Sequence, residues 1–190
     1  MLELLAPAGN LDAVIAAVQN GADAVYMGFG DGFNARRSAD NFTRESFAKA
    51  VRYCHIRGCK VYVTLNTLVG DREMEAAAAL AQQASDAGAD AILVQDLGLA
   101  RVLRDALPDI PLHASTQMSI HNLAGVEAAA EMGITRAVLS RELSLEQIRF
   151  ISQHASIETE VFVHGALCFC YSGQCYMSAL IGRRSGNRGA

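Results

Sequence analysis

The stretches that decide the fold are NGADAVYMG at residues 20–28 and AGADAILVQ at residues 87–95. Each runs from a Gly-Ala-Asp helix exit into a short apolar segment, which is typical of a strand buried in a parallel sheet. A looser third copy, MGITRAVLS, occupies residues 132–140. The repeat therefore predicts βα units whose strands lie side by side in one sheet.

The rest of the chain continues this alternation. Strands are expected at residues 2–6, 24–28, 60–66, 91–95, 112–116, 136–140 and 158–164, and helices at residues 11–20, 43–57, 71–87, 99–107, 122–132 and 144–154. Asn10 and Thr43 are expected N-caps, and Ser144 with Gln147 forms a capping box.

Such units fit either a (β/α) barrel or an open doubly wound sheet, and we favour the barrel. The predicted fold is therefore α/β and TIM-barrel-like, with about seven βα units visible. It is either incomplete or closed by the C-terminal tail or by a second subunit, which would make a homo-oligomer. No G-x-G-x-x-G or P-loop motif follows any strand, so the sequence does not favour a dinucleotide or P-loop site.

Length and composition indicate one globular domain. The 190 residues are 51% hydrophobic and 19% charged, with a net charge of −4. We expect a barrel-like domain over residues 1–165 and a Cys/Gly-rich segment, continuous with it, over residues 166–190. The negative charge argues against binding to nucleic acid or an anionic membrane by overall charge, so RNA would need local basic patches. The absence of a long apolar run or a signal-like N-terminus predicts a cytoplasmic protein.

A cluster of thiols follows the last predicted strand. The segment EVFVHGALCFCYSGQCYMS at residues 160–178 holds three of the five cysteines, Cys168, Cys170 and Cys175. Such a cluster suggests soft-metal chemistry, a redox pair or a nucleophile. By contrast, Cys54 and Cys59 are expected to be small buried hydrophobic residues.

The cysteine spacing leaves the chemistry open. Zinc is disfavoured, because six residues separate Cys168 from Cys175 and one separates it from Cys170, whereas paired zinc ligands usually stand two to four residues apart. A nucleophilic Cys168 with His164 as its base remains, and so does an iron-sulfur cluster, although this chain is short of the four ligands that such a cluster needs.

Polar residues gather where the predicted strands end, at the edge where barrel enzymes place their reactive groups. They are Asn34, Arg36, Asn66, Gln95, Asp96, His113, Ser115, Thr116, Gln117, Arg141, Glu142 and His164. Two arginines among amide and imidazole donors suit a small anionic substrate. Structural explanations compete with this one: Arg141 and Glu142 as a local ion pair, Asp96 as an N-cap, and His113 as a core histidine.

The thiol segment resembles a known signature. Its matching positions are Glu160, Phe162, Gly165, Ala166, Leu167, Cys168, Gly173, Cys175, Met177 and Ser178. They are similar to the signature of the collagenase-like peptidase family U32, and ELLAPAGN, NGADAVYMG, VTLNT, HASTQ, LSRELSLEQI and SGNRG also resemble its segments. Cys170 lies outside the signature and is expected to be incidental.

The resemblance implies several activities. Some members of the family are named collagenases or secreted proteases, others act in hydroxylation of tRNA or rRNA linked to prephenate, and relatives in ubiquinone synthesis hold a four-iron four-sulfur cluster on four cysteines. HASTQ, SREL and HGALC with YSGQCY resemble the RNA-hydroxylating branch most.

Carried onto this chain, the resemblance implies that Cys168 and Cys175 are the first two ligands of an iron-sulfur cluster whose other ligands would follow SGNRG. The expected catalytic or substrate-binding residues are Arg36, His113, Gln117, Arg141, Glu142 and His164, with RNA and a prephenate-like dicarboxylate as partners. The leading hypothesis is the N-terminal barrel of an iron-sulfur RNA hydroxylation enzyme, inactive as a fragment. The alternatives are a thiol- or metal-dependent collagenase-like peptidase and a non-catalytic scaffold or RNA-docking fragment.

Overall fold

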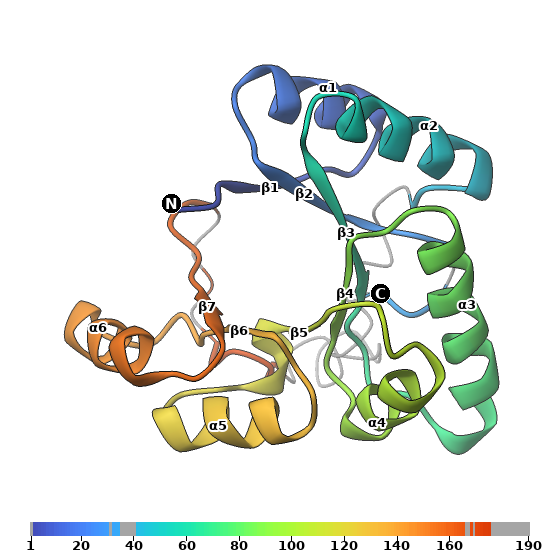
Figure 1. Cartoon of the computed structure of the whole chain (residues 1–190). Coiled ribbons are helices and arrows are strands. Elements are labelled where there is room, and N and C mark those ends of the chain that lie inside the picture. The colour runs from blue at the N-terminus through green and yellow to red at the C-terminus, as the bar shows by residue number, and fades with distance from the viewer. Residues whose placement is uncertain (1, 31, 35–40, 166–167, 169, 176–190) are drawn as a thin grey trace.

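A computed structural model describes residues 2–30, 32–34, 41–165, 168 and 170–175. Within them seven parallel strands follow one another in chain order, and the helices lie on the outside of the curved sheet (Figure 1). The strands are β1 (Leu5–Pro7), β2 (Ala24–Gly28), β3 (Lys60–Leu65), β4 (Ala91–Val94), β5 (Leu112–Ala114), β6 (Arg136–Val138) and β7 (Glu158–Glu160). This is the TIM-barrel-like α/β fold that the sequence predicts, open between β7 and β1.

The helices are those that the sequence predicts, with small shifts at their ends. They are α1 (Leu11–Gln19), α2 (Arg44–His55), α3 (Met74–Asp86), α4 (Leu97–Ala106), α5 (Leu123–Glu131) and α6 (Leu145–His154), with 3-10 turns η1 (Asp71–Glu73) and η2 (Thr116–Met118). Asn10 and Thr43 cap α1 and α2, and the Ser144–Gln147 capping box opens α6. No described helix has both the length and the apolar composition needed to cross a bilayer.

The Gly-Ala-Asp repeat has a physical explanation. Gly21 and Gly88 adopt φ values of 89° and 97°, the left-handed conformation that ends a helix and that side chains disfavour. The aspartate two residues later ties the coming strand to its neighbour. Asp23 accepts a hydrogen bond from the Leu4 amide (2.8 Å), and Asp90 accepts one from the Val61 amide (2.7 Å). The repeat thus fixes both the helix exit and the pairing of adjacent strands.

Two apolar layers form the core. Side chains alternate along the strands, so that Val61 and Val63 face the helices while Tyr62 faces the concave side. The larger layer lies between sheet and helices, and the smaller one, inside the curve, contains Ala24, Tyr62, Ala91, Leu93 and Val138. The open sheet therefore derives most of its burial from its outer, helix-covered face.

Strands 5, 6 and 7 are shorter than predicted. The sequence predicts strands to residues 116, 140 and 164, whereas the structure ends them at Ala114, Val138 and Glu160. The β5–β6 ladder pairs only two residues on each strand, and Thr116 already begins a 3-10 turn.

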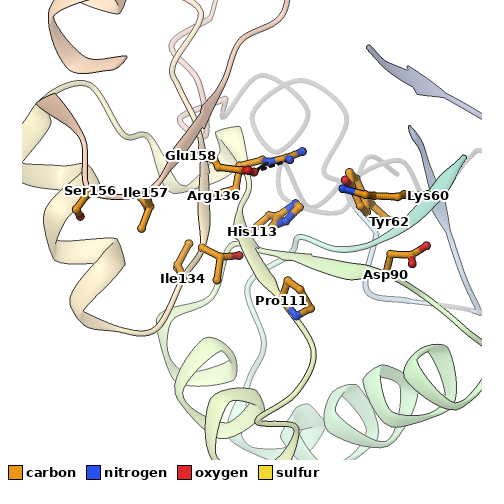
Figure 2. A pocket seen from close by; sticks show the side chains of 11 residues that line it. Lys60, Tyr62, Asp90, Pro111, His113, Ile134, Arg136, Ser156, Ile157 and Glu158 are labelled. Atoms are coloured by element: carbon orange, nitrogen blue, oxygen red, sulfur yellow. Dashed lines mark hydrogen bonds and ion pairs between the residues drawn. The ribbon is translucent and has the colours of Figure 1, made fainter. Parts of the chain in front are cut away.

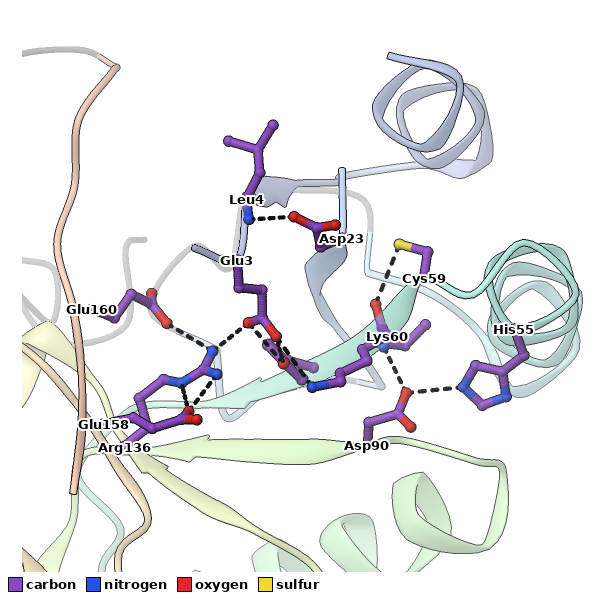
Figure 3. Close-up of polar contacts among 12 residues, drawn as sticks. Glu3, Leu4, Asp23, His55, Cys59, Lys60, Asp90, Arg136, Glu158 and Glu160 are labelled. Atoms are coloured by element: carbon purple, nitrogen blue, oxygen red, sulfur yellow. Dashed lines mark hydrogen bonds and ion pairs between the residues drawn. The ribbon is translucent and has the colours of Figure 1, made fainter. Parts of the chain in front are cut away.

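An ionic cluster spans the open side of the sheet (Figure 3). Arg136, at the start of β6, donates to Glu3 before β1 (2.5 Å) and to Glu158 in β7 (2.8 and 2.6 Å), and lies 3.6 Å from Glu160. The Tyr62 hydroxyl also donates to Glu3. The Arg136 side chain is only 10% exposed, and its partner Glu3 is 22% exposed whereas Glu158 is 67% exposed, so the contact with Glu3 is the better shielded of the two links between the edge strands.

We predict that Glu3→Gln destabilises the fold in a pH-dependent way. Burial acts to raise the pKa of Glu3, but hydrogen bonds from Arg136 and Tyr62 lower it to about 2. A carboxyl group whose pKa is lower in the folded state stabilises the fold at pH values above its pKa in the unfolded state. This contribution is lost as the pH falls from about 4.5 to about 2. The substitution should therefore reduce the free energy of unfolding by about 2 kcal/mol at pH 7, and by much less at pH 2.5.

Urea unfolding at both pH values measures this difference. The exposed Glu75 provides the control, because Glu75→Gln should leave stability within about 0.5 kcal/mol of the parent protein. A Glu3→Gln effect of equal size at pH 7 and pH 2.5 would show that the ionic cluster does not act through the charge of Glu3.

Candidate thiol site at the rim of the barrel

The cysteine-rich segment docks beside the carboxyl ends of β5 and β6. We call residues 168 and 170–175 the thiol loop. Its hydrogen-bond partners are Ser119, which follows β5, and Arg141 and Glu142, which follow β6. The loop therefore lies on the face of a βα barrel where reactive groups are normally placed.

Ser172 anchors the loop. Its backbone amide and its hydroxyl both donate to the carboxylate of Glu142, the hydroxyl at 3.1 Å. The backbone amide and the Nε of Arg141 each approach the Ser172 Oγ at 3.2 Å as donors. Since Ser172 is fully buried, its hydroxyl is satisfied by protein groups alone, and the anchor is specific to a small hydroxylated side chain.

A second contact joins the loop to the turn after β5. Ser119 adopts φ 60° and ψ 41°, a left-handed conformation that is unusual for a serine, and its hydroxyl donates to the Ser172 carbonyl at 2.6 Å. Gly173 packs against this turn so closely that a Cβ atom there would lie 2.3 Å from the Gln117 carbonyl oxygen. Only glycine fits this position.

Glu142 keeps its charge in this setting. Burial acts to raise its pKa, but hydrogen bonds from its own backbone amide and from Ser172 outweigh burial, and the pKa is lowered. His121 adds to this, because its Nε2 lies 3.5 Å from the Glu142 carboxylate. An ionised Glu142 can accept both hydrogen bonds from Ser172 at once.

The thiols differ in their chemistry. Hydrogen bonds from the Cys170 backbone and from the Arg141 side chain lower the pKa of the exposed Cys168 thiol. A hydrogen bond with the Cys175 thiol, together with burial, raises the pKa of Cys170. Arg141 also donates to the Cys170 carbonyl at 3.4 Å. Cys168 is therefore more readily available as a thiolate than Cys170.

Several predicted site residues meet here. Arg141, Glu142, Cys168 and Cys175 belong to the thiol loop or contact it, and Gln117 touches it through its carbonyl. His164 is exposed beyond the end of β7. Arg36 lies outside the described residues.

Structural roles were also considered for Arg141 and Glu142, as a local ion pair, and for Asp96, as an N-cap. Arg141 and Glu142 make no ion pair with each other in the part of the chain described, and both bind Ser172 instead. Asp96 is the N-cap of α4, which confirms that structural prediction. Its carboxylate accepts a hydrogen bond from the Leu99 amide at 2.8 Å. Asn66 donates to Ser115 at 3.2 Å, within the same rim.

Cys54 and Cys59 are buried, as predicted. Burial, followed by the neighbouring Cys59, raises the pKa of Cys54 to about 12. A thiol with so high a pKa is not a nucleophile at neutral pH.

His113 lies apart from the thiol loop. Its backbone pairs with Arg136 at the start of β6, whereas the thiol loop contacts Arg141 and Glu142 beyond the end of that strand. It contacts the Tyr62 ring edge-on, with centroids 4.9 Å apart, and lines a pocket of about 570 Å³ with Lys60 and Arg136 (Figure 2). Burial and then the charge of Arg136 lower its pKa to about 3, so the ring is neutral at pH 7.

Three residues of the site were missed by sequence reasoning, namely Ser119, His121 and Ser172. His121 Nδ1 lies 2.7 Å from the Ser119 carbonyl, so this nitrogen carries a proton and donates. The sequence signal for His121 is its position just beyond the HASTQ segment. The left-handed conformation of Ser119 and the burial of Ser172 leave no recognisable pattern in the sequence.

The described residues do not form a preassembled metal site. Across the described residues, no group of three or more His, Cys, Asp or Glu side chains is arranged to hold a metal ion. Cys168 and Cys175 have the soft donor atoms that iron-sulfur clusters use, and the lowered pKa of Cys168 favours the thiolate form that binds metal. Their donor chemistry suits such a cluster, but two thiolates are fewer than a cluster requires.

The fold and site together define a βα-barrel protein that carries a cysteine-rich loop on the carboxyl rim of its sheet. The chain belongs to peptidase family U32, whose family pattern matches residues 9–190. The family includes proteins named for RNA hydroxylation as well as proteins named as peptidases.

Two curated relatives are similar over nearly all of the chain. The 23S rRNA 5-hydroxycytidine C2501 synthase of Escherichia coli is 45% identical over 99% of this chain and 28% of its own length. The tRNA hydroxylation protein P1 of Bacillus subtilis is 40% identical over 98% of this chain and 44% of its own length. The chain therefore spans less than half the length of either relative.

A solved U32 peptidase has the same fold. It matches with a TM-score of 0.73 at 17% identity, covering 89% of this chain and 71% of the other. At that identity the comparison supports the fold alone.

We predict that Gly173→Ala releases the thiol loop from the rim. A methyl group at this position meets the Gln117 carbonyl and forces a φ of 74° on a residue with a side chain. Amide hydrogen exchange of the peptide containing Ser172 should rise at least tenfold, while the exchange of the strands stays unchanged.

Gly21→Ala is the matched control, since Gly21 also has a positive φ, 89°, but a methyl group there would have no atom within 4 Å. It should lower stability by about 1–2 kcal/mol without changing exchange in the thiol loop. If Gly173→Ala leaves loop exchange at the parent level, the close packing against Gln117 does not hold the loop.

Proposed function

We propose that this chain is the N-terminal barrel of an iron-sulfur protein that hydroxylates tRNA or rRNA. The observation that carries the proposal is the thiol loop, which Arg141 and Glu142 hold on the carboxyl rim through Ser172. A barrel presents its reactive groups at this rim. The two relatives named for rRNA and tRNA hydroxylation support RNA as the substrate.

The cluster would be held by Cys168 and Cys175, with further thiolates from outside residues 1–190. When bound, it would supply redox or Lewis-acid chemistry at the rim. The chain's own contribution is to fix the position of the two thiols through Ser172 and Gly173, and to place the Arg141 guanidinium beside the Cys168 thiolate. That cation offsets part of the negative charge that several thiolates bring together.

The proposal includes a prephenate-like dicarboxylate as a co-substrate. Arg141 is engaged by the thiol loop, so Arg36 is the predicted arginine that would be left for a carboxylate. His113 packs edge-on against Tyr62 and lines a pocket with Lys60 and Arg136, and we assign it to the inner packing of the barrel instead.

A thiol peptidase is the alternative that the chemistry of Cys168 favours, since an exposed thiol with a lowered pKa is a potential nucleophile. The contacts that lower this pKa come from Cys170 and Arg141, and neither is a general base. The hydroxylation proposal explains the neighbouring cysteines as well, and we prefer it for that reason.

Substitution of the thiols in the complete protein tests the proposal. In protein purified without oxygen, Cys168→Ser and Cys175→Ser should each remove more than half of the bound iron and sulfide, because serine is a poor ligand for such a cluster. Cells carrying either variant as their only copy should lack the hydroxylated nucleoside when their RNA is digested and analysed by mass spectrometry.

Cys170→Ser is the matched control in the same loop and should retain iron and RNA hydroxylation. An iron-free parent protein, or full hydroxylation by Cys168→Ser, would overturn the proposal. Gelatin cleavage that is lost in Cys168→Ser and does not depend on iron would establish the peptidase instead.

A further inference from the structure

The thiol loop presents an aromatic ring to solvent from a fixed backbone. Tyr171 is 67% exposed, although it stands between two anchored residues. On one side the Cys170 carbonyl accepts from Arg141, and on the other side Ser172 is fully buried in its hydrogen bonds. An aromatic side chain held this way loses little conformational entropy when a ligand binds it.

A second ring stands beside Tyr171. The His121 and Tyr171 ring centroids lie 6.4 Å apart with an interplanar angle of 47°. His121 is itself held in place, because its Nδ1 donates to the Ser119 carbonyl and lies 3.2 Å from the Ser140 hydroxyl. The tilt and the separation mean that the two rings do not stack on each other, so the Tyr171 face remains available to a flat ligand.

The position of these rings relates them to the chemistry of the site. Tyr171 is three residues from Cys168 and one from Cys170, and His121 contacts the Glu142 carboxylate that anchors the loop. A ligand stacked on Tyr171 would therefore lie next to the thiols. Stacking on a neutral ring does not require a basic surface, which agrees with the net charge of −4.

We propose that Tyr171, flanked by His121, is a stacking platform for an unstacked nucleobase of single-stranded RNA. The inference rests on the proposed function, in which an enzyme must take the reacting base out of its stack to reach it. Aromatic side chains bind such bases through their faces, and the ring, not the hydroxyl, provides the contact.

Binding of a labelled RNA to the complete protein tests the platform. The probe is a fluorescein-labelled decamer of cytidines, and its affinity is measured by fluorescence anisotropy. Tyr171→Ala should weaken binding by between about 5-fold and 150-fold, the effect of removing one base-aromatic stack. Tyr171→Phe should bind within about 2-fold of the parent protein, because it keeps the ring.

Two controls separate stacking from other effects. Phe150 is 53% exposed and pairs with His154 on α6, with centroids 4.5 Å apart, so Phe150→Ala removes an equivalent aromatic residue elsewhere and should leave RNA binding unchanged. A decamer of the same backbone without bases should bind the parent and Tyr171→Ala equally. Thermal unfolding of each variant should match the parent protein, since Tyr171 is not buried.

The following results would overturn the inference: parent-level affinity of Tyr171→Ala for the cytidine decamer, equal losses in Tyr171→Phe and Tyr171→Ala, or equal losses on the decamer without bases. Displacement of the RNA by a gelatin peptide, with the same sensitivity to Tyr171→Ala, would mark the platform as a peptide site. The assay needs neither iron nor turnover, so a failure of the hydroxylation proposal in the cysteine variants is measured independently of this result.

Discussion

The Arg136 cluster is the interaction on which the open sheet depends. A parallel sheet of seven strands that does not close has two edges, and only side chains can join them. Arg136 does this by binding Glu3 near β1 and Glu158 on β7 from a buried position. Removing one of these carboxylates leaves the buried Arg136 with fewer partners for its charge. Arg136 therefore links the two edges of the curved sheet through its carboxylate partners.

The two ends of the sheet have different physical roles. At the amino ends of the strands, Arg136 is paired with carboxylates and burial keeps His113 neutral, so these groups have structural roles within the fold. At the carboxyl end, Cys168 and Tyr171 are exposed while Ser172, which anchors their loop, is buried. Exposed reactive groups on a buried anchor are the arrangement that preorganises a site. This contrast, rather than the charge of the whole chain, distinguishes the functional end.

Much of the fold could be predicted from the sequence because local signals agree with one another. The Gly-Ala-Asp repeat predicted strands 2 and 4 to within one residue, since glycine ends the helix and aspartate ties the strands. The contacts of the thiol site were harder to predict from the sequence. Arg141 and Glu142 were identified by position, but their common partner Ser172 lies thirty or more residues away, and nothing in local patterning reports a contact of that separation. His113 shows the converse, because its position near a strand end suggested chemistry, whereas register and burial place it inside the barrel.

The Ser172 anchor explains why Arg141 and Glu142 are needed together. Glu142 accepts from the amide and hydroxyl of Ser172, which leaves the oxygen of that hydroxyl free to accept from Arg141. Arg141 can then direct its remaining donors to the Cys170 carbonyl and the Cys168 thiol. The carboxylate orients the serine, the serine positions the guanidinium, and the guanidinium stabilises the thiolate. Because each hydrogen bond orients the next group, the buried Ser172 helps to place the Arg141 donor, which, after the Cys170 backbone, lowers the pKa of Cys168.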